Sequence, residues 1–172
     1  MTGRPLMASA ADLDGAGEQD LCISCGLCCD GSLFWAVPVG PEEEVPVPLD
    51  AERRLRQPCA CFDGTCTVYA ERPAGCRSFD CRVLQTVRAG LRDRAWAEAE
   101  IAGMRRVLAE LDALLPRGDP SIYRRAAEFL SRHRHEIRTP AFQRRHRRLL
   151  RCLAAYDAAL ARFHVADRRG QG

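Results

Sequence analysis

The sequence predicts a mainly α-helical protein, in which a loop-rich, metal-stabilised cysteine module with short strands precedes a small bundle of three to four helices. Hydrophobic residues make up 47% of the 172 residues but aromatic residues only 6%, so the core must come largely from Leu, Val and Ala, which are typical of packed helices. Nine of the ten cysteines lie between Cys22 and Cys81, in a stretch rich in Pro and Gly. From Val83 onward the hydrophobic pattern becomes helical. The chain should therefore divide near residue 82.

The two ends of the chain are expected to be disordered tails, at residues 1–20 and 167–172. The first 20 residues contain neither an apolar run nor a basic start, so they do not resemble a secretory signal, and we expect a cytoplasmic protein. The longest uncharged stretch, near residues 31–41, is too short to cross a bilayer. Between the tails we expect a cysteine module at 21–82 and a helical region at 83–166.

The module should contain only short elements. Residues 33–37 are apolar and partly aromatic, which predicts a short strand. Residues 45–48 alternate Val and Pro and should be extended, because a residue that precedes Pro avoids the helical conformation. Residues 50–57 are expected to form one or two helical turns. Since no sustained apolar period runs through this stretch, something other than an apolar core should hold it together.

The second half should form helices with short connections. A short helix is expected at residues 82–92, and a longer one has an apolar face that includes Ile101, Met104 and Leu108 and ends at residues 116–120. Ser121 is expected to cap the next helix, which should continue until Thr139 and Pro140 interrupt it. A third long helix should follow and end near Phe163. Short connections make antiparallel neighbours the expected arrangement.

The main chemical signal is the run Cys22-x-x-Cys25-x-x-Cys28-Cys29. Two-residue gaps allow neighbouring thiolates to turn onto one ion. The first three cysteines also match the start of a bacterial ferredoxin run, but there the fourth follows after three further residues. Adjacent side chains of an extended segment point to opposite faces, so Cys28 and Cys29 should not serve one ion together. One of them is expected to face a second metal or to bridge.

A second set of cysteines follows later in the module: Cys59, Cys61, Cys66, Cys76 and Cys81. The nine thiols of the two sets suffice for two sites of four ligands, or for one cluster with spare thiols. In a cytoplasmic protein such a set indicates metal binding or redox chemistry rather than a disulfide scaffold. Cys152 stands alone and is expected to be a packed or half-exposed free thiol.

Both sets together resemble a known family. The run Cys22–Cys29 is followed by Cys59-x6-Cys66 and by the segment Tyr69-x-x-Arg72-Pro-x-x-Cys76-Arg77. This order resembles the YkgJ-type cysteine-cluster proteins, which are described as zinc- or iron-chelating domains. The resemblance covers roughly residues 20–82 and does not extend to the helical half. A related cluster occurs in flagellin lysine methylases, which implies that the wider group includes catalysts.

The resemblance implies a ligand set and a cofactor. The implied metal-binding thiols are Cys22, Cys25, Cys28, Cys29, Cys59, Cys66, Cys76 and Cys81. Cys61 stands where the family more often has an apolar residue. The implied cofactor is zinc or iron, with an iron–sulfur cluster included.

Two arginines lie close to these thiols in the sequence. Arg72 and Arg77 could neutralise thiolates or lower their pKa values, and so form part of the cofactor site. The alternative is that they pair with acidic neighbours, for which Asp63, Glu71 and Asp80 are available.

The charge is divided between the two halves. Residues 1–82 contain 13 acidic and 7 basic side chains, and residues 83–172 contain 10 and 19. The basic excess includes the run Gln143-Arg-Arg-His-Arg-Arg148. Such runs usually form a solvated or protein-facing surface, so we expect a protein partner through the helical half, with nucleic acid as the alternative.

Three functions remain open on the sequence alone. The first is a zinc- or iron-chelating protein that binds the metal, or an iron–sulfur cluster, through thiolates. The second is a redox or group-transfer enzyme that uses an iron–sulfur cluster. The third is a basic helical adaptor for nucleic acid with a structural metal. Motifs of hydrolases, kinases and dehydrogenases are absent from the sequence, so the residues leave open whether there is catalysis.

Overall fold

The structure is a computed structural model that describes residues 21–164, so both expected tails lie outside the described residues. Its elements follow a helical turn at residues 21–25. In chain order they are β1 (Ala36–Pro38), β2 (Arg54–Arg56), the 3-10 turn Tyr69–Glu71, α2 (Ala74–Arg77), α3 (Arg82–Arg88), α4 (Arg94–Leu114), α5 (Ile122–Arg132), α6 (Pro140–Arg145) and α7 (Arg147–Phe163). The prediction of a mainly α-helical protein is confirmed.

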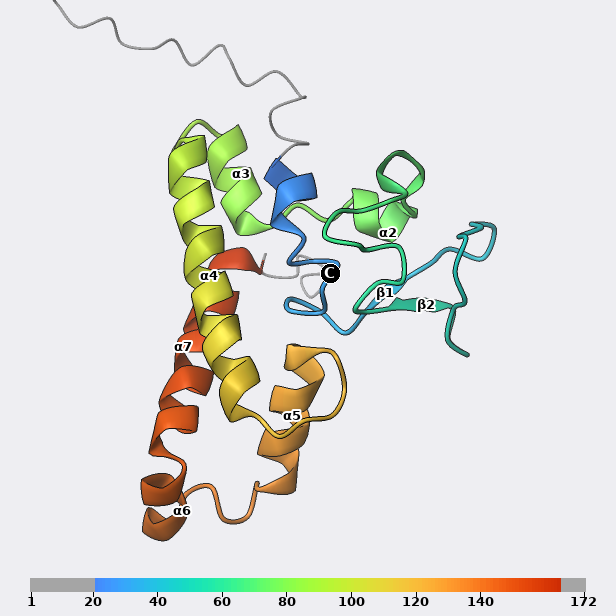
Figure 1. The fold of residues 1–172 in the computed structure, drawn as a ribbon. Coiled ribbons are helices and arrows are strands. Elements are labelled where there is room, and N and C mark those ends of the chain that lie inside the picture. Colours follow the sequence, from blue (N-terminus) through green and yellow to red (C-terminus); the bar gives the residue numbers. More distant parts are fainter. Residues whose placement is uncertain (1–20, 165–172) are drawn as a thin grey trace, which may run out of the picture.

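The two longest helices, α4 and α7, run antiparallel and side by side (Figure 1). Each buries one face, as the spacing of its apolar residues predicts. The buried residues are Ala97, Ile101, Met104, Leu108 and Leu111 on α4, and Leu149, Cys152, Leu153, Tyr156, Ala159 and Phe163 on α7. Helices α3, α5 and α6 pack around this pair.

Five helices form the described part of the helical region, instead of the three to four that we expected. The long third helix of the prediction is divided at His146, whose backbone leaves the helical conformation (φ −106°, ψ 18°). The ring of His146 packs against Phe142, with the ring centroids 4.3 Å apart. Helix α5 also ends earlier than expected, at Arg132, because His133 adopts a similar non-helical conformation.

Ser121 links the two halves of the chain. Its side chain caps α5 by accepting a hydrogen bond from the backbone N–H of Arg124, which confirms the predicted cap. Its hydroxyl also donates to the backbone oxygen of Gly31, 2.8 Å away. Tyr156 of α7 donates from its hydroxyl to the backbone oxygen of Ser32. The first turns of the cysteine module are therefore tied to the helices.

The start of the module also contributes to the helical core. Leu27 is completely buried and Leu33 is 2% exposed, and both belong to the apolar cluster formed by α4 and α7. The guanidinium of Arg105 on α4 donates to the backbone oxygens of Ser24 and Cys25. Residues 21–33 thus pack on the bundle instead of forming a separate body.

The small sheet differs from the expectation in one strand. β1 overlaps the end of the strand predicted at 33–37, but β2 lies in the segment for which we predicted helical turns, and that prediction is wrong. The two strands pair antiparallel with Val37 opposite Leu55, so both side chains share a second, smaller apolar cluster. This pairing is non-local, and the local sequence around Leu55 does not reveal it.

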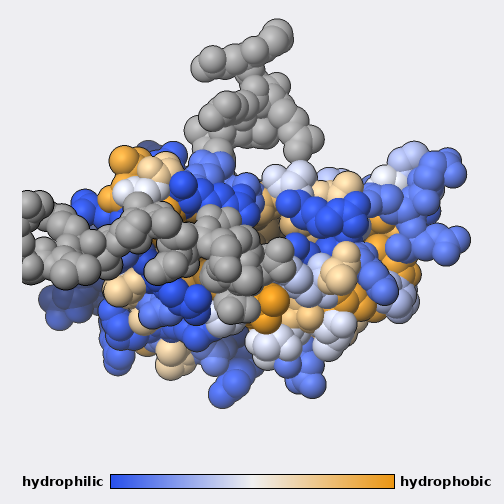
Figure 2. Space-filling view, turned by 90° about the horizontal axis from the view of Figure 1, so that it is seen from above, coloured by the Kyte–Doolittle hydropathy of each residue, from blue (hydrophilic) through white to orange (hydrophobic). Residues whose placement is uncertain are grey.

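Hydrophilic residues cover most of the face visible in Figure 2, with hydrophobic residues in small patches. The large hydrophobic residues with high exposure in the described part, Trp35, Leu91 and Leu130, come from separate elements. None of the helices in residues 21–164 has the length and apolar character that a bilayer crossing requires. The basic run at residues 143–148 lies around the α6–α7 junction, at the end of the bundle away from the cysteines (Figure 1).

Arg125 is a buried ion-pair residue that fastens α5 to the end of α4. It is 7% exposed, and its guanidinium donates to the carboxylate of Asp112 at 2.5 Å and to the backbone oxygens of Asp112, Leu115 and Pro116. Arg125→Leu would leave these acceptors without a donor, so we expect the free energy of unfolding to fall by about 2 kcal/mol.

Chemical denaturation followed by circular dichroism measures this change. The matched control is Arg132→Leu on the same helix, because Arg132 makes an exposed pair with Glu128 and its loss should cost less than about 0.5 kcal/mol. Equal losses in the free energy of unfolding from the two substitutions would contradict the conclusion that Arg125 stabilises the packing of α5 against the end of α4.

Candidate metal centre

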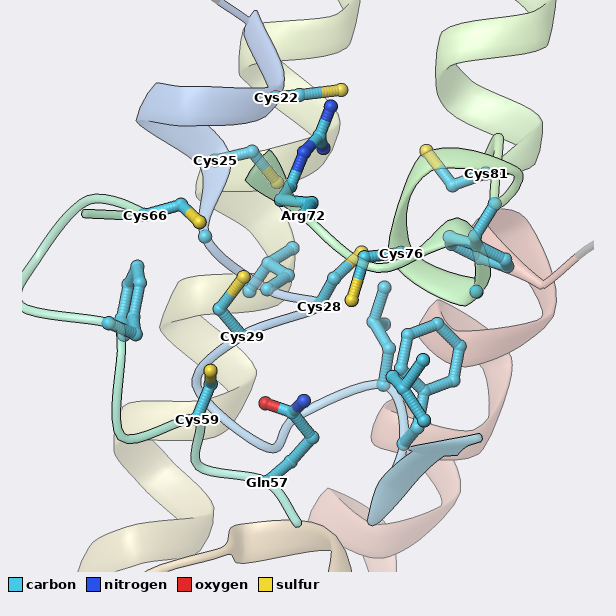
Figure 3. Close-up of a pocket in the computed structure, with 18 of the residues that line it drawn as sticks. Cys22, Cys25, Cys28, Cys29, Gln57, Cys59, Cys66, Arg72, Cys76 and Cys81 are labelled. Carbon is cyan, nitrogen blue, oxygen red and sulfur yellow. The ribbon is translucent and has the colours of Figure 1, made fainter. Parts of the chain in front are cut away.

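One cavity of about 300 Å³ lies between the loops of the module and the helices α3, α4 and α7. We call it the thiol cavity, because eight cysteines line it (Figure 3): Cys22, Cys25, Cys28, Cys29, Cys59, Cys66, Cys76 and Cys81. These are the eight cysteines that the family resemblance implies as ligands. Cys61 and Cys152 do not line the cavity. All ten are free thiols.

Four of the thiols form a first group. Cys22 and Cys25 lie on the helical turn at 21–25, Cys28 follows in the next turn, and Cys81 caps the N-terminus of α3. Burial raises the pKa of Cys25 to about 12, with smaller contributions from the nearby thiols of Cys81 and Cys22. Burial also raises the pKa of Cys28 well above its ordinary value, and Cys25, Cys81, the adjacent Cys29 and Cys22 contribute. These four thiols therefore lie within electrostatic reach of one another.

The other four form a second group. Burial raises the pKa of Cys29 to about 12, and the neighbouring thiols that add to the shift are Cys66, Cys59 and Cys76. Burial likewise raises the pKa of Cys76 to about 11, with contributions from Cys59 and Cys66. The backbone N–H of Cys59 donates to the backbone oxygen of Cys29 at 2.7 Å, which holds the two segments together.

The thiols that act most strongly on Cys28 are Cys25 and Cys81, and those that act most strongly on Cys29 are Cys66 and Cys59. That Cys28 and Cys29 serve different metal sites stays a prediction. The turn that separates them begins at Gly26, which has φ +62° and whose backbone oxygen accepts from the N–H groups of Cys29 and Asp30. A side chain at Gly26 would also collide with the ring of Phe62, because an added Cβ would lie 2.5 Å from it. Glycine is therefore required here for both conformation and space.

Backbone N–H groups point at sulfur in both groups. The N–H of Leu84 donates to Sγ of Cys81, and the N–H of Cys61 donates to Sγ of Cys59, each at 3.4 Å. Such donors stabilise a thiolate, although the pKa of Cys81 and of Cys59 is raised because burial outweighs them. A positive ion in the cavity would offset that burial by stabilising the charged form.

Arg72 lines the thiol cavity, whereas Arg77 does not. The guanidinium of Arg72 lies 3.5 Å from the centroid of the Tyr69 ring and donates to the backbone oxygen of that residue. Its charge acts to lower the pKa of Cys22 in the first group and of Cys76 in the second, against the larger effect of burial. Arg72 is therefore placed to neutralise both groups.

The expectation that Arg77 forms part of the cofactor site is not met. Its side chain is 54% exposed and lies 4.0 Å from the carboxylate of Glu43. Asp80, which the sequence offered as a partner for the two arginines, pairs instead with Arg88. Both residues belong to α2: Cys76 lines the cavity (Figure 3). Arg77, the next residue, lies beside Glu43 instead.

The chemistry of the donor set fits zinc or iron, since both are bound by thiolates in groups of four. In residues 21–164, however, no three or more Cys, His, Asp or Glu side chains are grouped in a way that could hold a metal ion. The thiols would have to close on a single ion, or a larger cluster would have to span them.

Gln57 is a site residue that the sequence reasoning missed. It follows β2, is 2% exposed and lines the thiol cavity. Its Oε1 is buried and has no hydrogen-bond partner among the described residues. The available signal was its position two residues before Cys59, but the wrong prediction of helical turns at 50–57 obscured it.

The comparisons with known proteins found no relatives. No protein-family model, curated protein or solved structure matches this chain. The resemblance to YkgJ-type proteins therefore stays a prediction that rests on the residues of the motif.

Proposed function

We propose that this protein binds zinc or iron through two groups of four thiolates in the thiol cavity. The observation that carries the proposal is the convergence of eight cysteines from distant parts of the module on one cavity. Four is the number of thiolates that a structural zinc ion or an iron–sulfur cluster requires.

The charges near the cavity support the same proposal. Four thiolates outweigh the charge of one divalent ion, so each loaded centre would remain negative. Arg72 lies between the two groups and supplies a positive charge there. The N–H groups of Leu84 and Cys61 supply hydrogen bonds to sulfur.

Metal analysis of the chain purified without air tests the proposal directly. We expect close to two centres per chain, either as zinc or as iron with inorganic sulfide, and the visible spectrum separates the two. A colourless zinc protein contains no iron–sulfur cluster. Protein that retains no metal, and takes up neither zinc nor iron after reduction, would refute the proposal.

A second candidate is a redox or group-transfer enzyme that uses an iron–sulfur cluster. The observation that favours it is the size of the cavity, since 300 Å³ is room for roughly ten water molecules at about 30 Å³ each and exceeds the needs of two single ions. Phe34, Phe79 and Phe163 line part of the same cavity and give that part an apolar wall. A coloured protein whose visible absorption bleaches on reduction would favour this candidate, and zinc alone would exclude it.

Cys25→Ser and Cys152→Ser should differ sharply in metal content. Cys25 lines the cavity, and a hydroxyl binds soft metals far more weakly than a thiolate, so Cys25→Ser should lose the metal of the first group. Cys152 is the matched control, because it is buried on α7 with its thiol directed at the backbone oxygen of Val107. Metal per chain is the measurement, and equal content in both variants would show that Cys25 is not a ligand.

A further inference from the structure

The end of the bundle that contains α6 and the start of α7 is strongly basic, and it lies away from the cysteines (Figure 1). Residues 129–156 contain eight arginines and a single acidic residue, Glu136. Two of the arginines form exposed ion pairs, Arg132 with Glu128 and Arg148 with Glu110. The other six are exposed and form no ion pair with a carboxylate of the described residues: Arg134, Arg138, Arg144, Arg145, Arg147 and Arg151. We call these six residues the basic surface.

The basic surface works against the stability of the free protein. Arg147 and Arg151 lie at the start of α7, where the backbone N–H groups already make the end of the helix positive. The first turn of α7 contains no acidic residue, and no side chain caps it. Since like charges repel one another and the helix end, folding alone does not explain these arginines. A negatively charged partner would relieve the repulsion.

The surroundings of the basic surface indicate the chemistry of that partner. No large hydrophobic side chain is exposed between residues 131 and 151, whereas protein interfaces have an apolar centre and membrane-bound helices insert an apolar face. Phe142 is the only Phe, Tyr or Trp in this stretch and is 6% exposed, so it offers no ring on which the bases of a single strand could stack. Guanidinium groups, in contrast, match phosphate oxygens in both charge and geometry.

We propose that the basic surface binds the phosphate backbone of a nucleic-acid duplex. The contact is independent of base sequence, because the arginines meet phosphates and not base edges. The sequence pattern alone favours a protein partner, but the lack of exposed apolar side chains reverses that preference. The surface is separate from the thiol cavity, so this binding goes beyond the proposed metal function and does not depend on it.

Fluorescence anisotropy tests the proposal with a short labelled DNA duplex, and an RNA duplex of the same sequence, titrated with the full-length chain at several salt concentrations. The logarithm of the binding constant should fall linearly with the logarithm of the salt concentration, with a slope no steeper than about −5 for six phosphate contacts on DNA. Replacement of Arg144, Arg147 and Arg151 by Gln should weaken binding by roughly tenfold or more at low salt. It should also reduce the magnitude of the slope by about 3.

The matched control removes the same charge elsewhere. It replaces three exposed arginines of other elements by Gln, which also form no ion pair with a described carboxylate: Arg56, Arg92 and Arg106. The control should bind the duplex as wild type does. In thermal unfolding without nucleic acid, the variant of the basic surface should be at least as stable as wild type, because its substitutions relieve repulsion.

The results decide between phosphate and other partners. Equal weakening by the two triple variants would show that only the net charge matters and would overturn the inference. Duplex binding that does not depend on salt would also overturn it. Poly-glutamate that competes as well as the duplex would assign the surface to an acidic protein instead. Selective weakening in the basic-surface variant supports the proposal, and the tighter of the two duplexes identifies the nucleic acid.

Discussion

Cys28→Ser and Cys29→Ser are expected to remove different parts of the bound metal. The thiols that act most strongly on Cys28 are Cys25 and Cys81, with smaller contributions from Cys29 and Cys22, so its loss should empty the first centre. Cys29 is coupled to the second group instead, and Cys29→Ser should leave the first centre in place. The physical reason is that the side chains of adjacent residues leave the backbone in different directions.

Metal per chain, for wild type and both variants, is the measurement. Purification must exclude air, because oxidation of a thiolate would mimic the loss of a ligand. Cys61→Ser is a suitable control, since Cys61 belongs to the same segment as Cys59. Cys61 is buried in the small apolar cluster and does not line the cavity. Complete loss of metal in both variants would indicate one shared cluster. Unchanged metal content in Cys29→Ser would show that Cys29 is not a ligand.

Helical periodicity and cysteine spacing predicted the parts of the molecule that depend on local pattern. The apolar faces of α4 and α7 follow from residues such as Ile101 and Leu153, whose spacing is fixed by the helix itself. The break at His146 was not predictable in this way, because neither Gly nor Pro marks it. The packing of its ring against Phe142 and Phe129, which lies on another helix, accompanies the break.

The candidate site was predictable to the extent that its residues are cysteines. The adjacency of Cys28 and Cys29 predicts two environments, and this stays a prediction, although different thiols act most strongly on each of the two. Gln57 was missed, because its place at the cavity depends on the pairing of Leu55 with Val37, which the local pattern does not reveal. Arg77 was assigned to the site from its distance in sequence, but α2 directs it toward Glu43.

The largest expected effect of metal removal is local unfolding of residues 59–81. Neither the 3-10 turn Tyr69–Glu71 nor α2 contains a buried residue, so little apolar surface holds this segment in place. The segment nevertheless contributes Cys59, Cys66, Cys76 and Cys81 to the cavity, and bound metal would cross-link it to residues 22–29. Its folding should therefore be coupled to metal binding.

The helical region should survive the same treatment. The start of the module is held on the core between α4 and α7 by the apolar contacts of Leu27 and Leu33 and by hydrogen bonds from Arg105, Ser121 and Tyr156. None of these contacts requires a metal. After treatment with a strong chelator, most of the helical circular dichroism should therefore remain. Loss of the helical signal together with the metal would contradict this separation.

Limited digestion with trypsin distinguishes the two parts, because trypsin cleaves after arginine and both parts contain arginines. Cleavage after Arg77 in α2 should become fast when the metal is removed, whereas cleavage after Arg106 within α4 should stay slow. Restoring the metal should protect Arg77 again. If the chelated protein keeps its resistance at Arg77, then the small apolar cluster around Val37 and Leu55 is sufficient to hold the segment, and the thiols are not what folds it.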